Sequence, residues 1–281
     1  MVTSLITAIP TDALAIAFMA PGQCREFTDG SLHEKMVPYT IIAQVLFGHY
    51  EITCNGLSEI IQPGEAFLTP ANHPMAIMHR GDTAHGNLMG ARWNHIHFTL
   101  FDTLDVTSLL DMPLKLSTQK AQRLGRIIQE LLALETEQNS NPIEILARRH
   151  TKSFETLYIL SDLAPLKPES QAVLRHAQRL TGVFAHIRDH LADPFTPADL
   201  ARLGHMSLSR FHATFREHLG TTPMDYVKKL RLDEACKRLL ISDDSIYDIA
   251  AKVGFTNQFH FSREFNTRFG MSPFHPRLLF V

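Results

Sequence analysis

The stretch IYDIAAKVGFTNQFHFSREFNTRFGMSP, residues 246–273, decides the fold of the C-terminal part of the chain. A serine N-cap precedes it, and Gly254 stands where a turn between two helices needs a left-handed residue. Asn257 then caps a second helix, in which Phe261 and Phe265 are four residues apart and share one face. Together these parts predict a helix-turn-helix motif.

The same pattern occurs 50 residues earlier in the chain. Ala201-Arg-Leu-Gly204 matches Ala251-Lys-Val-Gly254, and the match continues without a gap over 23 positions to Pro223 and Pro273. Thr196 and Ser207 are the expected caps of the two helices of this first motif. This register predicts that Gly204 and Gly254 are equivalent turn residues, and that Ala201 and Ala251 occupy equivalent sites of close helix approach.

Burying the phenylalanines of each second helix turns polar side chains outward. In the major groove Gln recognises adenine and Arg recognises guanine, while hydroxyl groups and other Arg side chains suit phosphates. The residues expected to contact DNA are Ser207, Ser209, Arg210, His212 and Arg216 in the first motif and Asn257, Gln258, Phe259, Ser262 and Arg263 in the second. For any one of these residues, an ordinary solvated face is the alternative.

Residues 224–240 join the two motifs and contain no glycine or proline. They predict a helical rod of about 25 Å, which suits two recognition helices entering successive major grooves about 34 Å apart. Its cations either contact phosphates or form its solvated side; they are Lys228, Lys229, Arg231, Lys237 and Arg238.

The second motif resembles the signature of the AraC family of bacterial transcription regulators. The resemblance covers about residues 184–277 and implies seven helices, two helix-turn-helix motifs and binding to double-stranded promoter DNA. It implies that the third and sixth helices read bases, here with Ser209, His212 and Ala213 and with Gln258, Phe259 and Arg263. Family members often place a long polar side chain where Ala213 stands, so we expect the first motif to read fewer bases. The DNA-binding domain is assigned to residues 176–281.

Charge is divided unevenly along the chain. Residues 1–170 have 12 Lys and Arg against 18 Asp and Glu, a net charge of −6, whereas residues 171–281 have 15 against 11, a net charge of +4. A basic module beside an acidic one is expected when only one of them meets phosphates. The three cysteines are sparse, and no Lys or Arg precedes Arg25, so we expect a reducing cytoplasm, no signal peptide and no membrane partner.

Residues 1–115 combine short apolar runs with turn signals such as Asn55-Gly56 and Pro63-Gly64. The segments PGEAFLTP, residues 63–70, and WNHIHF, residues 93–98, resemble parts of the cupin-like sensor of the same family. Residues 1–115 are therefore assigned to a cupin-like, effector-sensing β-barrel of the jelly-roll type.

Two helices are expected within residues 118–164, where apolar residues recur at helical spacing. Residues 116–164 are assigned as a helical dimerisation segment by the resemblance, and residues 165–175 as a linker. The whole chain is expected to be an α+β multidomain protein, with the barrel first and an all-α DNA-binding domain at the end.

The resemblance aligns His33, Trp93 and His95 with ligand-contacting positions of the sugar-sensing member that gave the family its name. Tryptophan could stack on the apolar face of a sugar ring, and histidine offers a donor and an acceptor. The alternative is that all three are core residues. A metal site would need ligands where Met36, Pro38 and Met75 stand, so neither metal nor cofactor is expected, although His95-x-His97 puts two histidines on one strand face.

We therefore expect a DNA-binding transcription regulator rather than an enzyme, with no catalytic residues. It is expected to be a homodimer and an activator that works with RNA polymerase and responds to a sugar or related metabolite. Two alternatives remain. One is a regulator without a ligand, in which the barrel only dimerises or binds a partner protein; the other is a metal-dependent cupin enzyme fused to a DNA-binding domain.

Overall fold

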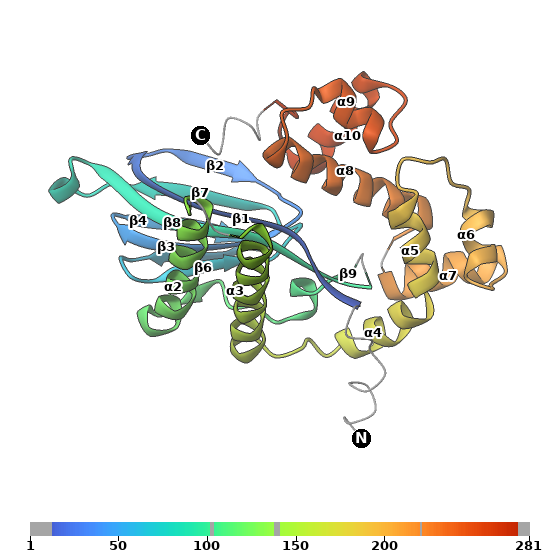
Figure 1. Cartoon of the computed structure of the whole chain (residues 1–281), viewed down its shortest axis with the longest axis horizontal. Coiled ribbons are helices and arrows are strands. Elements are labelled where there is room, and N and C mark those ends of the chain that lie inside the picture. Colours follow the sequence, from blue (N-terminus) through green and yellow to red (C-terminus); the bar gives the residue numbers. More distant parts are fainter. Residues whose placement is uncertain (1–12, 102–103, 138–140, 220, 275–281) are drawn as a thin grey trace. The chain divides into compact units, whose positions relative to one another are not determined.

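A computed structural model describes residues 13–101, 104–137, 141–219 and 221–274, without side-chain detail for residues 175–179 and 218 (Figure 1). The chain divides into two compact units. The sheet unit consists of residues 16–98 and 105–166, and the helical unit consists of the described parts of residues 1–15, 99–104 and 167–274. Among the described helices, none has the length and apolar character needed to cross a membrane.

Two antiparallel sheets build the sheet unit. The first has the order β1-β8-β3-β6-β10, with β9 beside β8, and the second has the order β2-β7-β4-β5. The strands are β1 (Leu14–Thr28), β2 (Leu32–Lys35), β3 (Thr40–Phe47), β4 (His49–Cys54), β5 (Leu57–Ile61), β6 (Ala66–Thr69), β7 (Met75–Arg80), β8 (Leu88–Leu100), β9 (Leu104–Asp105) and β10 (Lys115–Leu116). Short 3-10 helices occur at Thr83–His85 and Thr107–Leu109.

The inner faces of the two sheets pack on one another through aromatic side chains. Tyr50 of β4 contacts Phe67 of β6 with ring centroids 5.1 Å apart, and Phe27 of β1 contacts His79 of β7 at 4.3 Å. Each pair joins one sheet to the other, as in a jelly-roll sandwich. The described strands form two separate sheets and not a closed barrel, so the expected barrel is corrected to a two-sheet sandwich of the same jelly-roll type.

The turn signals of the sequence occur where strands reverse. Cys54 pairs with Leu57 across Asn55 and Gly56, whose φ angles are 52° and 76°. Two residues with positive φ form the tight hairpin whose twist matches that of the flanking strands. The predicted turn at this position is confirmed, and it is the turn of a hairpin between β4 and β5.

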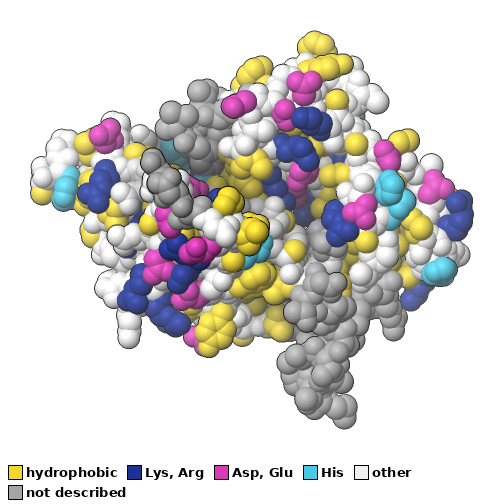
Figure 2. All heavy atoms as spheres, viewed as in Figure 1, with side chains coloured by type: hydrophobic (Ala, Val, Ile, Leu, Met, Phe, Trp, Pro, Cys, Tyr) yellow, Lys and Arg dark blue, Asp and Glu magenta, His cyan; other side chains and the backbone are white. Residues whose placement is uncertain are grey.

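Two helices, α2 (Thr118–Glu135) and α3 (Pro142–Leu163), cover the outer face of the first sheet (Figure 1). Gln44 of β3 lies so close to Gly125 of α2 that a Cβ there would overlap it, and Phe154 of α3 lies 6.4 Å from Phe98 of β8. The two predicted helices are confirmed. On the side of the molecule shown in Figure 2, basic and acidic side chains alternate over these helices, consistent with ion pairs such as Lys152–Glu130 at 2.6 Å.

The described residues of the helical unit after residue 169 are all in helices or short connections. The helices are α4 (Ser170–Arg179), α5 (Thr181–Asp189), α6 (Pro197–Leu203), α7 (Leu208–Leu219), α8 (Pro223–Ile241), α9 (Ile246–Lys252) and α10 (Gln258–Phe269). Helix α4 begins at Ser170, inside the segment expected to be a linker. Counted from α5, where the resemblance begins, the described residues form six helices, and α7 and α10 are the third and the sixth of them, as the resemblance implies. The seventh implied helix is not among the described residues that follow α10.

Candidate nucleic-acid interface

The second helix-turn-helix motif consists of α9, a turn and α10. Ser245 accepts a hydrogen bond from the backbone N–H of Asp248 at 3.1 Å, and Gly254 has a φ of 86°. The side-chain oxygen of Asn257 accepts from the N–H groups of Phe259 at 2.8 Å and His260 at 3.2 Å. Both predicted caps and the left-handed turn residue are therefore confirmed for this motif.

The buried side of α10 fixes its orientation. Phe261, Phe265 and Phe269 are almost fully buried, and the rings of Phe265 and Phe269 lie 4.6 Å apart. The opposite side holds Phe259, which is 86% exposed, and the side chain of Arg263, which is 74% exposed. The remaining candidate readers of this helix, Gln258 and Ser262, are half-buried. Asn257 is exposed, but its side-chain oxygen is used by the cap.

Glu264 connects α10 to α8. Its carboxylate lies 3.2 Å from the Lys228 ammonium of α8, 3.6 Å from His260 and 3.8 Å from Arg263. An ion pair with an exposed Arg at such a distance is worth little in water. The guanidinium of Arg263 is therefore available to a stronger partner, such as a guanine edge.

The first motif consists of α6, a turn and α7. Thr196 accepts from the N–H of Asp199 at 3.2 Å and Ser207 accepts from the N–H of Arg210 at 3.3 Å, so both predicted caps are confirmed. Phe211 and Phe215 are fully buried with ring centroids 4.7 Å apart. The opposite side of α7 exposes Ser209, Arg210, Ala213 and Arg216, with His212 half-buried.

The two motifs differ by one residue in the turn. The backbone N–H of Gly204 donates to the oxygen of Leu200, as that of Val253 donates to Ile249. In the same way, the N–H of Met206 donates to the oxygen of Ala201, and that of Phe255 donates to Ala250. The first helix and its turn therefore repeat after 49 residues, whereas the capped recognition helices repeat after 50. Thr256 is the extra residue in the second motif.

Two predictions from the 50-residue register are therefore wrong. The structural counterpart of buried Ala201 is Ala250, which is 2% exposed, and Ala251 faces solvent. The left-handed residue of the first turn is His205, with a φ of 51°, whereas Gly204 has an ordinary φ of −78°. The sequence match assigned the left-handed conformation to Gly204 because it aligned that residue with the identical Gly254. The backbone hydrogen bonds instead align Gly204 with Val253 and His205 with Gly254.

Helix α8 is the predicted rod, now 19 residues long and about 28 Å in length. Its cations are engaged within the helical unit. Lys237 is buried, Lys229 lies 3.7 Å from Asp233, and Arg238 lies 2.8 Å from Glu234. Asp233 is itself buried and accepts from Arg268 of α10 at 2.8 Å.

Comparison with known proteins agrees with this geometry. A family model described as a helix-turn-helix domain matches residues 200–277. The transcriptional activator RhaS of Escherichia fergusonii is 38% identical over 95 residues, which are 34% of this chain and 34% of RhaS. RhaS of Escherichia coli is 30% identical over 151 residues, which are 53% of this chain and 52% of that protein. The C-terminal domain belongs to the AraC family. The chain thus spans about half or less of the length of these curated relatives.

The overall architecture of the chain also has solved counterparts. The crystal structure of ToxT from Vibrio cholerae has a TM-score of 0.57, with 10% sequence identity, and the match covers 94% of this chain and 98% of ToxT. At this identity the likeness concerns the fold alone. It agrees with a jelly-roll sheet unit followed by a helical unit.

The predicted effector residues lie on the inner faces of the two sheets. Trp93 and His95 are on β8 with ring centroids 6.2 Å apart, and His33 of β2 lies 4.8 Å from His79 of β7. Phe27 links the two pairs, because its ring lies 6.0 Å from Trp93 and 4.3 Å from His79. The structure therefore brings all three predicted residues into one aromatic cluster. Sequence reasoning did not assign His79 or Phe27 to this cluster. The signal that points to His79 is the strand period of β7, whose buried residues Met75, Ile77 and His79 alternate with less buried ones.

The histidines of this cluster are held in the neutral form. Burial lowers the pKa of His79 to about 4, and it lowers the pKa of His95 well below its usual value. Burial also lowers the pKa of His33, with a further contribution from the charge of Lys35. Neutral imidazole donates from one nitrogen and accepts at the other, so the cluster offers both kinds of hydrogen bond to a polar ligand. Among the described residues, no group of three or more His, Cys, Asp or Glu side chains could hold a metal ion.

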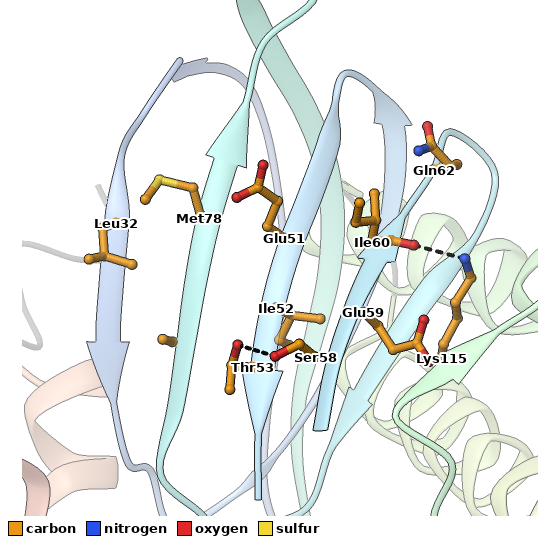
Figure 3. A pocket seen from close by; sticks show the side chains of 11 residues that line it. Leu32, Glu51, Ile52, Thr53, Ser58, Glu59, Ile60, Gln62, Met78 and Lys115 are labelled. Atoms are coloured by element: carbon orange, nitrogen blue, oxygen red, sulfur yellow. Dashed lines mark hydrogen bonds between the residues drawn. The ribbon is translucent and has the colours of Figure 1, made fainter. Parts of the chain in front are cut away.

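A separate groove of about 800 Å³ lies on the outer face of the second sheet (Figure 3). Leu32, Met78, Glu51 and Ile60 pair side by side across its four strands. Glu51 stands between Met78 and Ile60 and is held by Arg80 through two hydrogen bonds of 2.9 and 3.2 Å. The other three members, Leu32, Met78 and Ile60, are the apolar row of this groove. The groove lies on the face opposite to the aromatic cluster, so it shares none of the predicted effector residues.

Proposed function

We propose that the chain is a sequence-specific transcription regulator that binds double-stranded promoter DNA through α7 and α10. One observation carries the proposal: both helices have a side-chain N-cap, a buried phenylalanine face and an exposed polar face, and a single helix joins their motifs. Helices of this kind enter the major groove and contact base edges with their first turns. The ten candidate contact residues named above are proposed to divide between bases and phosphates.

The test is selection of binding sites from a random duplex library with the purified full chain. We expect one sequence class to be enriched and its affinity to fall steeply as salt rises, because phosphate contacts release counterions. Equal affinity for every duplex at physiological salt would refute the proposal.

The aromatic cluster supports the finer proposal that a sugar or related metabolite binds between the two sheets. Trp93 is the only tryptophan of the chain, so its emission reports on this site. A binding effector should change that emission, and the change should be weakened in His33→Gln but retained in Thr53→Ala, a control variant in the outer groove. An unchanged response in His33→Gln would show that the effector binds elsewhere.

Homodimerisation is proposed to involve α3, which exposes three large apolar side chains: Ile143, Leu146 and Tyr158. Replacing Leu146 with Glu should convert a dimer to monomers in sedimentation velocity, whereas Gln122→Glu, on an exposed position of α2, should not. We further propose that the dimer acts in the cytoplasm as an activator with RNA polymerase, by analogy with the activator RhaS. A reporter gene behind a selected site measures the sign of regulation.

The apolar row of the outer groove favours one alternative, in which the sandwich binds a partner protein and no small molecule. No change of Trp93 emission or of melting temperature with any sugar or related metabolite would favour this version. A metal-dependent cupin enzyme fused to the DNA-binding domain is the remaining alternative. Metal analysis of the purified protein tests it, because stoichiometric iron, zinc or manganese would support that reading.

A further inference from the structure

Arg231 lies on α8 and is half-buried, with its guanidinium directed at backbone carbonyl groups. Its Nε donates to the oxygen of Leu191 at 2.9 Å, its Nη2 donates to the oxygen of Asp193 at 2.6 Å, and its Nη1 donates to the oxygen of Gly254 at 3.1 Å. The ring of Phe195 lies beneath the guanidinium, 5.9 Å from Cζ. The planar fork of arginine matches three acceptors in one plane, which the single ammonium of lysine cannot do.

The three carbonyl groups belong to two different parts of the DNA-binding domain. Leu191 and Asp193 follow α5, whose Phe184 contacts Phe215 of the first recognition helix at 6.4 Å. Gly254 forms the turn of the second motif, three residues before the cap of α10. Both sites lie just beyond a helix C-terminus, where carbonyl groups lack helical partners and the helix dipole favours a cation.

Two other charged side chains of α8 pair with the second motif. The pairs Asp233–Arg268 and Lys228–Glu264 join α8 to α10. Arg231 differs from them, because its hydrogen bonds hold the segment before the first motif and the turn of the second motif at the same time. The absence of a Cβ at Gly254 permits this contact, since a Cβ there would lie 2.9 Å from Cζ of Arg231.

We propose that Arg231 is a positioning residue that sets the distance and rotation between the two recognition helices, and thereby the spacing between the base pairs that they read. This inference rests on the proposed function. Adding one base pair between two half-sites moves them by about 3.4 Å and rotates them by about 34°. A domain held by Arg231 should reject that change, and a domain without this link should accept it more readily.

The experiment uses the full chain and the duplex that the wild-type protein enriches from a random library. That duplex is then made with one base pair added or removed between the half-sites. We expect the wild-type protein to lose at least about tenfold in affinity for each altered spacing. Arg231→Lys should narrow that loss to about threefold or less. Arg238→Lys, on the same helix but paired with Glu234, should retain the wild-type discrimination.

A merely structural role would lower the affinity of Arg231→Lys for all three duplexes by the same factor, and this result would overturn the inference. If Arg231→Lys loses its helical circular dichroism signal, the variant is unfolded and Phe195→Leu is tested in its place. This variant is a milder change, because it keeps Arg231 and alters only the ring beneath the guanidinium. Unchanged spacing discrimination in Phe195→Leu would then overturn the inference. If the wild-type chain enriches no sequence at all, the proposed function itself fails, and the inference fails with it.

Discussion

Replacing Gly254 with Ala should destabilise the helical unit far more than replacing Gly204. At Gly254 an L-residue would hold a φ of 86°, which costs about 1 kcal/mol. Its Cβ would lie 2.8 Å from the backbone oxygen of Ala192 and 2.9 Å from Cζ of Arg231, and such overpacking costs roughly 1–3 kcal/mol. The expected loss is therefore about 3 kcal/mol.

At Gly204 the backbone is ordinary, with a φ of −78°, and the atom nearest to a Cβ would be a methyl group of Val183 at 3.3 Å, followed by two backbone oxygens at 3.6 Å. The same substitution there also restricts the unfolded chain, so the net change should stay within about 1 kcal/mol of zero. Gly204→Ala is thus the matched control for Gly254→Ala.

Urea unfolding of the full chain, followed by circular dichroism at 222 nm, measures the difference. With a slope of about 2 kcal/mol per molar urea, Gly254→Ala should lower the midpoint of the helical unit by roughly 1.5 M. Emission from Trp93 follows the sheet unit and should change little in either variant. Equal midpoint shifts for the two alanine variants would refute the reasoning, because they would make the two glycines equivalent.

The remaining predictions concern single side chains. Arg263→Ala should relax base choice in one half-site at a cost of about 1–3 kcal/mol, measured by titration of base-substituted duplexes; a uniform loss would indicate a phosphate contact. Asp233→Ala removes the buried carboxylate that pairs with half-buried Arg268 and should lower stability by about 3 kcal/mol in urea, so a neutral result would contradict the pair. His205→Gly should stabilise the helical unit by about 1 kcal/mol, because its φ is 51°, and a lower urea midpoint would contradict this. The folded pKa of His79 lies below that of the unfolded chain, so the unfolded state gains protons first as pH falls below about 6.5. The sheet unit should lose about 2 kcal/mol by pH 5, seen in tryptophan emission during urea unfolding, and His79→Gln should reduce that loss.

Sequence alone predicted the local features of the helical unit. Caps such as Thr196 and Asn257 act within three residues of themselves, and a phenylalanine pair spaced by four residues defines a buried face without any distant partner. The hairpin at Asn55 and Gly56 was predictable for the same reason, because its turn conformation depends on those two residues.

Features that depend on distant partners were beyond the sequence. From the sequence, Arg231 and Lys237 were expected to be solvated or to contact phosphates. Arg231 instead donates to carbonyl groups 23 and 40 residues away along the chain, and Lys237 is buried. In the sheet unit, which face of β7 turns inward depends on its register with β2 and β4, so His79 could not be joined to His33 beforehand. The two-sheet arrangement likewise follows from strand pairing, which no local signal specifies.

The extra residue at Thr256 limits how this domain can be rebuilt by recombination. Because the length difference is confined to the turn, the segments 207–219 and 257–269 are equally long and begin at equivalent caps. They can be exchanged as cassettes without altering the chain on either side. A crossover within the first helix of a motif, made at the 50-residue register, would instead join the two helices one residue out of phase. The part of the chain after the crossover would then be rotated by about 100° around the helix axis. Chimeric regulators with exchanged DNA preferences should therefore be cut at Ser207 and Asn257.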